Sequence, residues 1–173
     1  DSDLELAIRL AINKPTGNLF YSDVSELVTL DASGVYDFDV ADLTGIHCLD
    51  NLENLYVFKL EWSKNRISDL SPLSSLTNLV ELELAGNDVN DLGPISNCVN
   101  IEYLGLVQNK VSDLNPLSLF LNLEHLNAWE NEISSLEGLS GLTGLIHLDV
   151  HGNQISDLSP ISELPNLTLL DVS

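Results

Sequence analysis

The stretch HLDVHGN, at residues 147–153, places two imidazoles and a carboxylate at alternate positions, at His147, Asp149 and His151. Successive side chains of an extended strand point to opposite faces, so these three residues would share one face. Imidazole and carboxylate groups are common ligands of zinc in proteins. The stretch is therefore consistent with a metal site, with a binding surface, or with the exposed side of a repeating scaffold.

Composition and charge narrow the classes of protein. The chain has 173 residues, 44% of them hydrophobic, and its 6 basic and 27 acidic residues give a formal net charge of −21. Such a charge repels phosphate backbones and anionic lipid headgroups, so neither nucleic acid nor a membrane is expected as a partner. No apolar run approaches the ~18 residues of a membrane span, and no signal peptide is visible. Two cysteines, Cys48 and Cys98, are too few for a disulfide framework.

Asparagines recur every 22 residues, which indicates an internal repeat. They are Asn65, Asn87, Asn109, Asn131 and Asn153. The same apolar frame surrounds each one, and for Asn109 it consists of Ile101, Leu104, Leu106, Val111, Leu114, Leu117 and Phe120. This pattern, L-x-x-L-x-L-x-x-N-x-L, is identified as the leucine-rich repeat. We expect the asparagine amides to satisfy backbone groups of the adjacent coil.

The spacings within this frame predict the fold. The L-x-L step is typical of a strand whose leucines face inward, and the later apolar residues, three apart, suit a 3₁₀ turn or an extended return path. One repeat cannot bury its apolar stripe alone, so stacked repeats form one continuous core. We therefore predict an α/β leucine-rich repeat solenoid, a right-handed horseshoe with a parallel concave β-sheet, a 3₁₀ or extended convex side and an α-helical N-terminal cap.

The two ends of the chain differ from this pattern. Residues 1–26 are predicted to form the helical cap, with a capping box from Ser2 to Glu5, an edge strand at 19–21 and a second short helix from residue 22. Residues 27–173 hold about six to seven repeats, the last incomplete. Either Leu52-Leu55-Val57 or Val57-Leu60-Trp62 forms the second strand. Because the chain starts without Met and stops within a repeat, we expect the natural protein to continue.

The outward side chains form three columns across the predicted sheet, whose strands lie about 4.8 Å apart. The first column is Lys59, Glu81, Tyr103, His125, His147 and Leu169. The second is Glu61, Glu83, Gly105, Asn127, Asp149 and Asp171, and the third is Ser63, Ala85, Val107, Trp129, His151 and Ser173. The candidate binding residues are Glu81, Glu83, Tyr103, His125, Asn127, Trp129, His147, Asp149 and His151.

This patch of aromatic and imidazole side chains is interpreted as a protein-binding face, because protein interfaces use such groups as anchors. A surface without a ligand is the alternative. A metal site at His125, His147 and His151 is disfavoured, since neighbouring strands leave these side chains parallel rather than convergent, and no second shell for such ligands is visible. No cofactor and no catalytic residue are predicted, because the P-loop, G-x-S-x-G, H-E-x-x-H and C-x-x-C motifs are absent. The protein is predicted not to be an enzyme.

The repeats resemble the internalin-type leucine-rich repeats of bacterial surface proteins. The resemblance rests on "NRISDLSPLSSLTNLVELELAGN" (65–87), "NQISDLSPISELPNLTLLDVS" (153–173) and the cap "AIRLAINKPTGNLFYSDVSELVTLDASG" (7–34). It implies an extracellular or cell-wall-associated bacterial adhesion module that binds another protein, or a glycan, on its concave sheet. An intracellular scaffold or enzyme regulator and a structural spacer in a larger surface protein are the alternatives.

Overall fold

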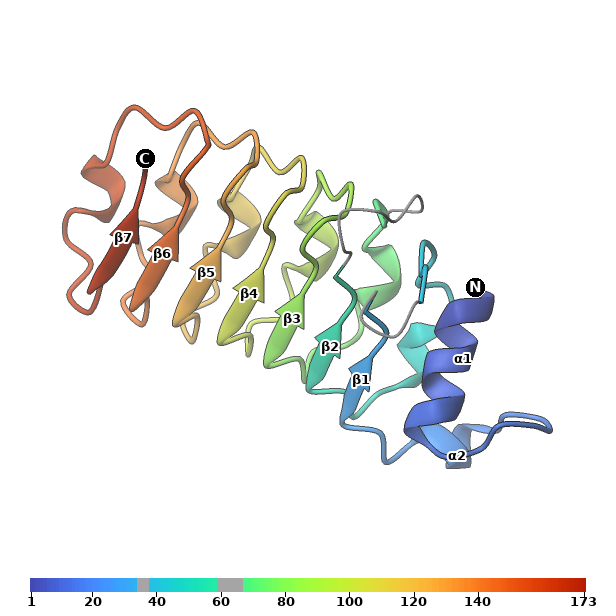
Figure 1. Cartoon of the computed structure of the whole chain (residues 1–173). Helices are drawn as coiled ribbons and strands as arrows, with labels where there is room; N and C mark the ends of the chain where they lie inside the picture. The colour runs from blue at the N-terminus through green and yellow to red at the C-terminus, as the bar shows by residue number, and fades with distance from the viewer. Residues whose placement is uncertain (34–37, 59–66) are drawn as a thin grey trace.

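The structure, a computed structural model of the 173-residue chain, describes residues 1–33, 38–58 and 67–173. Its strands lie side by side in one sheet, and short helical turns lie behind them (Figure 1). All neighbouring strands are parallel, and their order in the sheet is their order in the sequence. The strands are β1 (Thr29–Asp31), β2 (Asn54–Tyr56), β3 (Glu81–Glu83), β4 (Tyr103–Gly105), β5 (His125–Asn127), β6 (His147–Asp149) and β7 (Leu169–Asp171). The predicted parallel sheet is confirmed.

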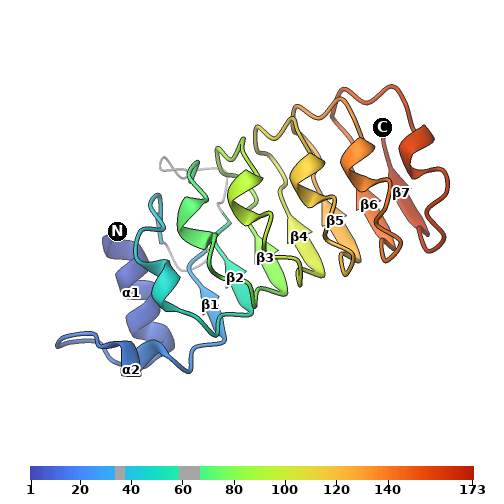
Figure 2. The same cartoon turned by 180° about the vertical axis from the view of Figure 1, so that it is seen from behind.

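The side opposite the sheet consists of 3₁₀ turns, which Figure 2 shows from behind. They are η2 (Ile46–Cys48), η3 (Ser71–Leu73), η4 (Gly93–Ile95), η5 (Asn115–Leu117), η6 (Glu137–Leu139) and η7 (Ser159–Ile161). Proline lies at the start of η3, η4, η5 and η7. Its fixed φ suits the first turn of a helix, where no amide donor is needed. The predicted convex side of the solenoid is confirmed.

The central leucine of each strand points into the stack. Leu82, Leu104 and Leu126 are fully buried and lie in register with one another. Together with the apolar side chains of the 3₁₀ turns they form one core that runs along the described chain. The residues on either side of each leucine face outward, because side chains alternate along a strand. Stacking of the repeats thus buries apolar side chains that a single repeat could not bury.

The structure resolves the alternative for the second strand. Leu55 lies in β2, pairs with Leu30 and Leu82 in the neighbouring strands, and is buried. Leu52 and Val57 are buried as well. The first of the two predicted strands is therefore the correct one. The other alternative falls on Leu60 and Trp62, which lie outside the described residues.

Asparagine side chains tie consecutive coils together. The Nδ2 of Asn109 donates to the carbonyls of Leu84 (2.9 Å) and Leu106 (3.1 Å), and its Oδ1 accepts from the N–H of Val89 (2.9 Å). Equivalent bonds are made by Asn87, Asn131 and Asn153. Asn87, Asn109 and Asn131 are buried. The predicted structural role of this column is confirmed, apart from Asn65, which lies outside the described residues.

Two helices, α1 (Ser2–Ala11) and α2 (Tyr21–Val24), lie at the β1 end of the stack (Figure 1). The α1 residues Leu4 and Ala7 are buried in the core, so this helix covers the open end of the sheet. Among the described residues, no helix is long and apolar enough to cross a membrane. The division of the chain into a cap (1–26) and repeats (27–173) stays a prediction.

Two details of the predicted cap are wrong. The carboxylate of Asp1, not the hydroxyl of Ser2, caps α1 by accepting from the N–H groups of Asp3 and Leu4. The edge strand expected at 19–21 is absent, because Tyr21 begins α2. The carboxylate of Asp23 accepts from the N–H of Phe20 at 2.7 Å and fixes the start of this helix.

Candidate functional site

All nine candidate binding residues lie on the outward side of the sheet or just after its strands, on a surface named here the concave face. The first column pairs Glu81 with Tyr103, Tyr103 with His125, and His125 with His147. The second column pairs Asn127 with Asp149, and Asp149 with Asp171. Every one of the nine is half-buried. Parallel pairing of short strands therefore brings together residues 22 positions apart in the sequence.

One row of rings crosses β4, β5 and β6. The rings of Tyr103 and His125 lie 6.5 Å apart between centroids at an interplanar angle of 40°. Those of His125 and His147 lie 6.0 Å apart and are perpendicular. Edge-to-face packing at this distance is favourable, because the positive ring edge meets the negative ring face. The three side chains form a continuous half-buried band on the concave face.

A second ring pair lies beyond the ends of β5 and β6. Trp129 and His151 stack with centroids 5.0 Å apart and an interplanar angle of 11°. The Nδ1 of His151 lies 2.7 Å from Oδ1 of Asp149, which also accepts from the His151 N–H. The stacked Trp129 ring and the Asp149 carboxylate at Nδ1 together restrict the orientation of the imidazole.

Two tyrosine–glutamate hydrogen bonds cross over β3. The hydroxyl of Tyr56, on β2, donates to Oε2 of Glu81, and the hydroxyl of Tyr103, on β4, donates to Oε2 of Glu83 at 2.8 Å. Both bonds are diagonal, since the register places Tyr56 opposite Glu83 and Tyr103 opposite Glu81. The Nδ2 of Asn127 donates to the Tyr103 hydroxyl at 3.2 Å and extends the network to β5. We call Tyr56, Glu81, Glu83 and Tyr103 the crossed cluster.

These contacts change the titration of both tyrosines. The hydrogen bond to the Glu81 carboxylate, helped by burial, raises the pKa of Tyr56 to about 12. Burial, followed by the negative charge of Glu83, raises the pKa of Tyr103 to about 12. Both phenols therefore stay protonated at neutral pH and act as permanent donors to the two carboxylates.

Tyr56 is a site residue that the sequence pattern missed. The predicted columns continued in steps of 22 residues and placed Lys59 and Glu61 beside Glu81 and Glu83. That prediction is wrong: the neighbours on β2 are Asn54 and Tyr56, and Lys59 and Glu61 lie outside the described residues. The step from Leu55 to Leu82 is 27 residues, and this irregularity was the available signal.

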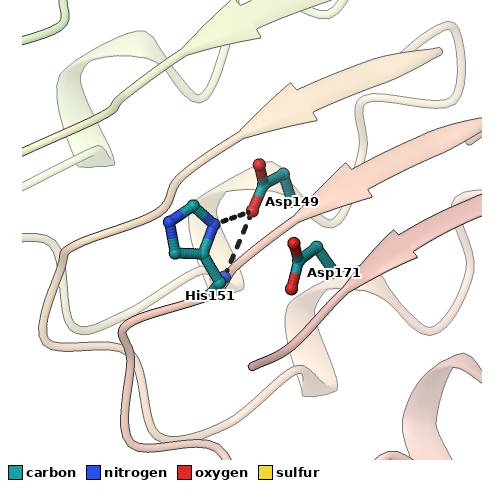
Figure 3. Close-up of side chains that lie close together, drawn as sticks. All are labelled: Asp149, His151 and Asp171. Carbon is teal, nitrogen blue, oxygen red and sulfur yellow. Dashed lines mark hydrogen bonds and ion pairs between the residues drawn. The ribbon is translucent and has the colours of Figure 1, made fainter.

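The three histidines of the disfavoured metal site do not come together as one group. His125 and His147 pack against each other, whereas His151 turns to Asp149. Among the described residues, ligand atoms of Asp149, His151 and Asp171 lie within 4.8 Å of one another (Figure 3). One ligand atom of each residue already has a partner: Nδ1 of His151 bonds Oδ1 of Asp149, and Oδ1 of Asp171 accepts from the N–H and the hydroxyl of Ser173.

The one described cysteine in the core is unsuited to nucleophilic chemistry. Cys98 is fully buried, and burial raises the pKa of its thiol to about 11. A thiol rather than a thiolate is therefore present at neutral pH, and the thiolate is the reactive form. Cys98 packs as a small apolar residue, as its place in the repeat predicts.

Comparisons with known proteins agree with this architecture. A family model described as leucine-rich repeats (two copies) matches residues 77–119 and again residues 121–163. No curated protein matches the chain by sequence. Among solved structures, the chain is similar to an internalin (InlF) from Listeria monocytogenes, with 31% sequence identity and a TM-score of 0.88. The match covers 98% of this chain and 48% of that chain. The chain thus spans about half the length of that relative.

Two further solved structures from Listeria monocytogenes are similar. Internalin C2 is 28% identical, with 98% of this chain and 93% of that chain covered and a TM-score of 0.63. The functional domain of InlJ is 22% identical, with 100% of this chain and 45% of that chain covered and a TM-score of 0.74, a likeness that concerns the fold alone.

The chain is a leucine-rich repeat protein: its parallel strands bury their central leucines, and a column of asparagines hydrogen-bonds consecutive coils. With InlF and internalin C2 among its structural relatives, it is an internalin-like leucine-rich repeat protein. Solenoids of this kind generally serve as protein-binding modules, because their extended sheets offer a large, rigid surface.

Proposed function

We propose that this chain is a non-catalytic protein-binding and adhesion module that binds its partner on the concave face. The observation that carries the proposal is the band of half-buried rings from Tyr103 through His125 to His147, with Trp129 stacked on His151 beside it. Aromatic side chains bury large areas with few rotatable bonds and are enriched among the residues that dominate binding energy. Because ring contacts already order them, little side-chain entropy remains to be lost on binding.

A protein ligand fits this face better than a glycan. His151 covers one face of the Trp129 ring, which leaves less ring surface on which a sugar could stack. The acidic and amide groups of Glu81, Glu83, Asn127 and Asp149 lie around the rings, and protein interfaces likewise have a polar rim around their central anchors. A bacterial surface or secreted location is part of the proposal, and the likeness to internalins supports it.

The chemistry of the face also favours binding over catalysis. Glu81 and Glu83 receive hydrogen bonds from tyrosine hydroxyls on an open sheet. Catalytic carboxylate pairs need burial that drives their pKa values apart. These two carboxylates lie on a half-exposed surface, which suits recognition of a charged partner.

The test compares partner capture by variants of two different surfaces. The wild-type chain and a Trp129→Ala/His147→Ala variant are immobilised, exposed to a protein extract, and the captured proteins are quantified by mass spectrometry. We expect a set of proteins that the wild type retains and the variant loses, since an interface anchor costs about 2 kcal/mol or more when truncated. Both side chains face outward, so thermal unfolding should shift by little.

The matched control is Leu119→Ala/Leu121→Ala. These leucines are 66% and 60% exposed and lie outside the concave face, between η5 and β5. This variant should keep the captured set, which separates loss at the proposed site from loss of any exposed apolar area. Equal capture by the wild type and the concave variant would contradict the proposal.

A further inference from the structure

The basic side chains that the structure describes form ion pairs at a distance from the crossed cluster. The chain carries a formal net charge of −21. Within residues 1–33, 38–58 and 67–173, the basic side chains Arg9, Lys14 and Lys110 each pair with a carboxylate: Arg9 with Glu5 (2.7 Å), Lys14 with Asp23 (2.6 Å) and Lys110 with Asp88 (2.7 Å). The acids of the concave face are therefore not neutralised by these cations.

Glu83 is held in one orientation by three features. The Tyr103 hydroxyl donates to its Oε2 at 2.8 Å, and the Ala85 N–H donates to its Oε1 at 2.9 Å. Gly105 leaves the space that the carboxylate fills, because a Cβ at this position would lie 2.2 Å from Oε2. A carboxylate fixed in this way loses little freedom when it binds a cation.

Glu81, on the same strand, also accepts a hydrogen bond from a tyrosine. Its partner in the described chain is the Tyr56 hydroxyl, and the tyrosine rings lie on the strands to either side of β3. Both carboxylates thus accept hydrogen bonds from neutral phenol groups. Carboxylates next to aromatic rings are the groups that bind a guanidinium or ammonium, through charge-assisted hydrogen bonds and cation–π contact.

We propose that the crossed cluster is a subsite for an arginine or lysine side chain presented by a basic segment of the protein partner. The inference rests on the proposed function, and it names the chemistry of the partner. The cluster is continuous with the ring band, since Tyr103 belongs to both. A basic segment with apolar or aromatic neighbours would complement both parts of the face, and the negative net charge would speed its approach.

A protein cation fits this arrangement better than a metal ion. Metal ligands converge on one point, whereas Glu81 leans to Tyr56 on β2 and Glu83 leans to Tyr103 on β4. Among the described residues, the group whose ligand atoms do converge is Asp149, His151 and Asp171, and it lies at the other end of the sheet. Separated, individually fixed carboxylates suit side chains spaced along a peptide.

The first experiment titrates the labelled chain with N-acetyl-arginine amide, followed by NMR. The Ala85 amide is the reporter, because its N–H bonds the Glu83 carboxylate. We expect a saturable shift of this amide with the arginine probe and none with N-acetyl-citrulline amide, its neutral isostere. Glu83→Gln should weaken binding about tenfold, the equivalent of one charge-assisted hydrogen bond. Tyr103 can still donate to the Gln amide oxygen, so the fold is retained.

The matched control is Glu137→Gln, which changes the net charge equally at an exposed position in η6 on the convex side. This variant should bind the arginine probe as the wild type does. An equal response to citrulline, or unchanged binding by Glu83→Gln, overturns the inference.

A second experiment separates this inference from the proposed function. Partner capture is repeated with Glu81→Gln/Glu83→Gln, and we expect loss of capture together with a steep fall of wild-type capture as salt is raised. If the Glu variant captures as well as the wild type while Trp129→Ala/His147→Ala does not, the cation subsite is overturned and the proposed function stands. If neither concave variant loses capture, both fail.

Discussion

Asn109 shows how much one side chain contributes in this fold, because its amide satisfies three backbone groups of two successive coils. Leu84 and Val89 belong to one coil, and Leu106 belongs to the next. Replacement by leucine would leave these groups buried without partners. We expect Asn109→Leu to lower the free energy of unfolding by about 1–3 kcal/mol. Chemical denaturation followed by circular dichroism measures the loss. The control Asn90→Leu, at an exposed asparagine nearby, should be nearly neutral.

The tyrosines of the crossed cluster give a pH prediction at the same scale. Their pKa values in the folded protein are raised to about 12 from a normal value of 10.0. A raised pKa means that these contacts stabilise the fold fully below pH 10, and that this contribution is lost as the pH rises through the folded pKa. We expect ultraviolet titration to include phenol ionisations near pH 12, of which Tyr56→Phe and Tyr103→Phe each remove one. Ionisation of both near pH 10 in the folded chain would contradict the crossed hydrogen bonds.

The 3₁₀ turns show how an element depends on the coil beside it. In η3, η4, η5 and η7 a proline fills the position that Gly138 occupies in η6. At Gly138 a Cβ would lie 2.2 Å from the carbonyl oxygen of Leu114 and 2.7 Å from the backbone nitrogen of Asn115. The η6 turn therefore approaches the backbone of the preceding coil more closely than a side chain permits.

We expect Gly138→Ala to destabilise the fold by about 1–3 kcal/mol, because backbone atoms of a packed coil cannot give way without shifting the stack. Thermal unfolding measures the change. Gly141→Ala is the control, since a Cβ there would meet nothing within 4 Å. Equal stability of the two variants would show that η6 can move away from the Leu114 carbonyl.

At the scale of the whole molecule, the position of a repeat in the stack determines what its core leucine contributes. Leu104 has a neighbouring coil on each side and is fully buried, whereas Leu170, its equivalent in β7, is 44% exposed. We expect Leu104→Ala to cost about 2–5 kcal/mol. Leu170→Ala should cost about 1 kcal/mol or less, because much of its surface already meets water.

Urea unfolding of both leucine variants tests this dependence. Arrays of repeats can depart from two-state unfolding, so the slope of the transition is compared along with its midpoint. Equal losses at Leu104 and Leu170 would mean that the stack unfolds as one unit whose end is as cooperative as its centre.

The repeat period alone determined most of this architecture. In a solenoid the neighbours of a residue in space are the residues one period away in the sequence, so a spacing of 22 predicts the strands, the buried leucines and the asparagine column. For the same reason the columns from Glu81 to His147 on the concave face could be predicted before any coordinates. Their role in binding stays a prediction.

The tertiary structure decided what the period does not encode. The spacings of 25 and 27 residues around Leu55 break the period, so the pairing of Tyr56 with Glu83 does not follow from a step of 22 residues. Side-chain conformation decided the polar contacts on the concave face. It links Tyr103 to Glu83 across a diagonal and turns His151 toward Asp149 and Trp129, away from the other histidines. Sequence spacing places a Cβ in its column, but which neighbour the polar tip reaches depends on local hydrogen bonding and packing, which form only when the coils are stacked.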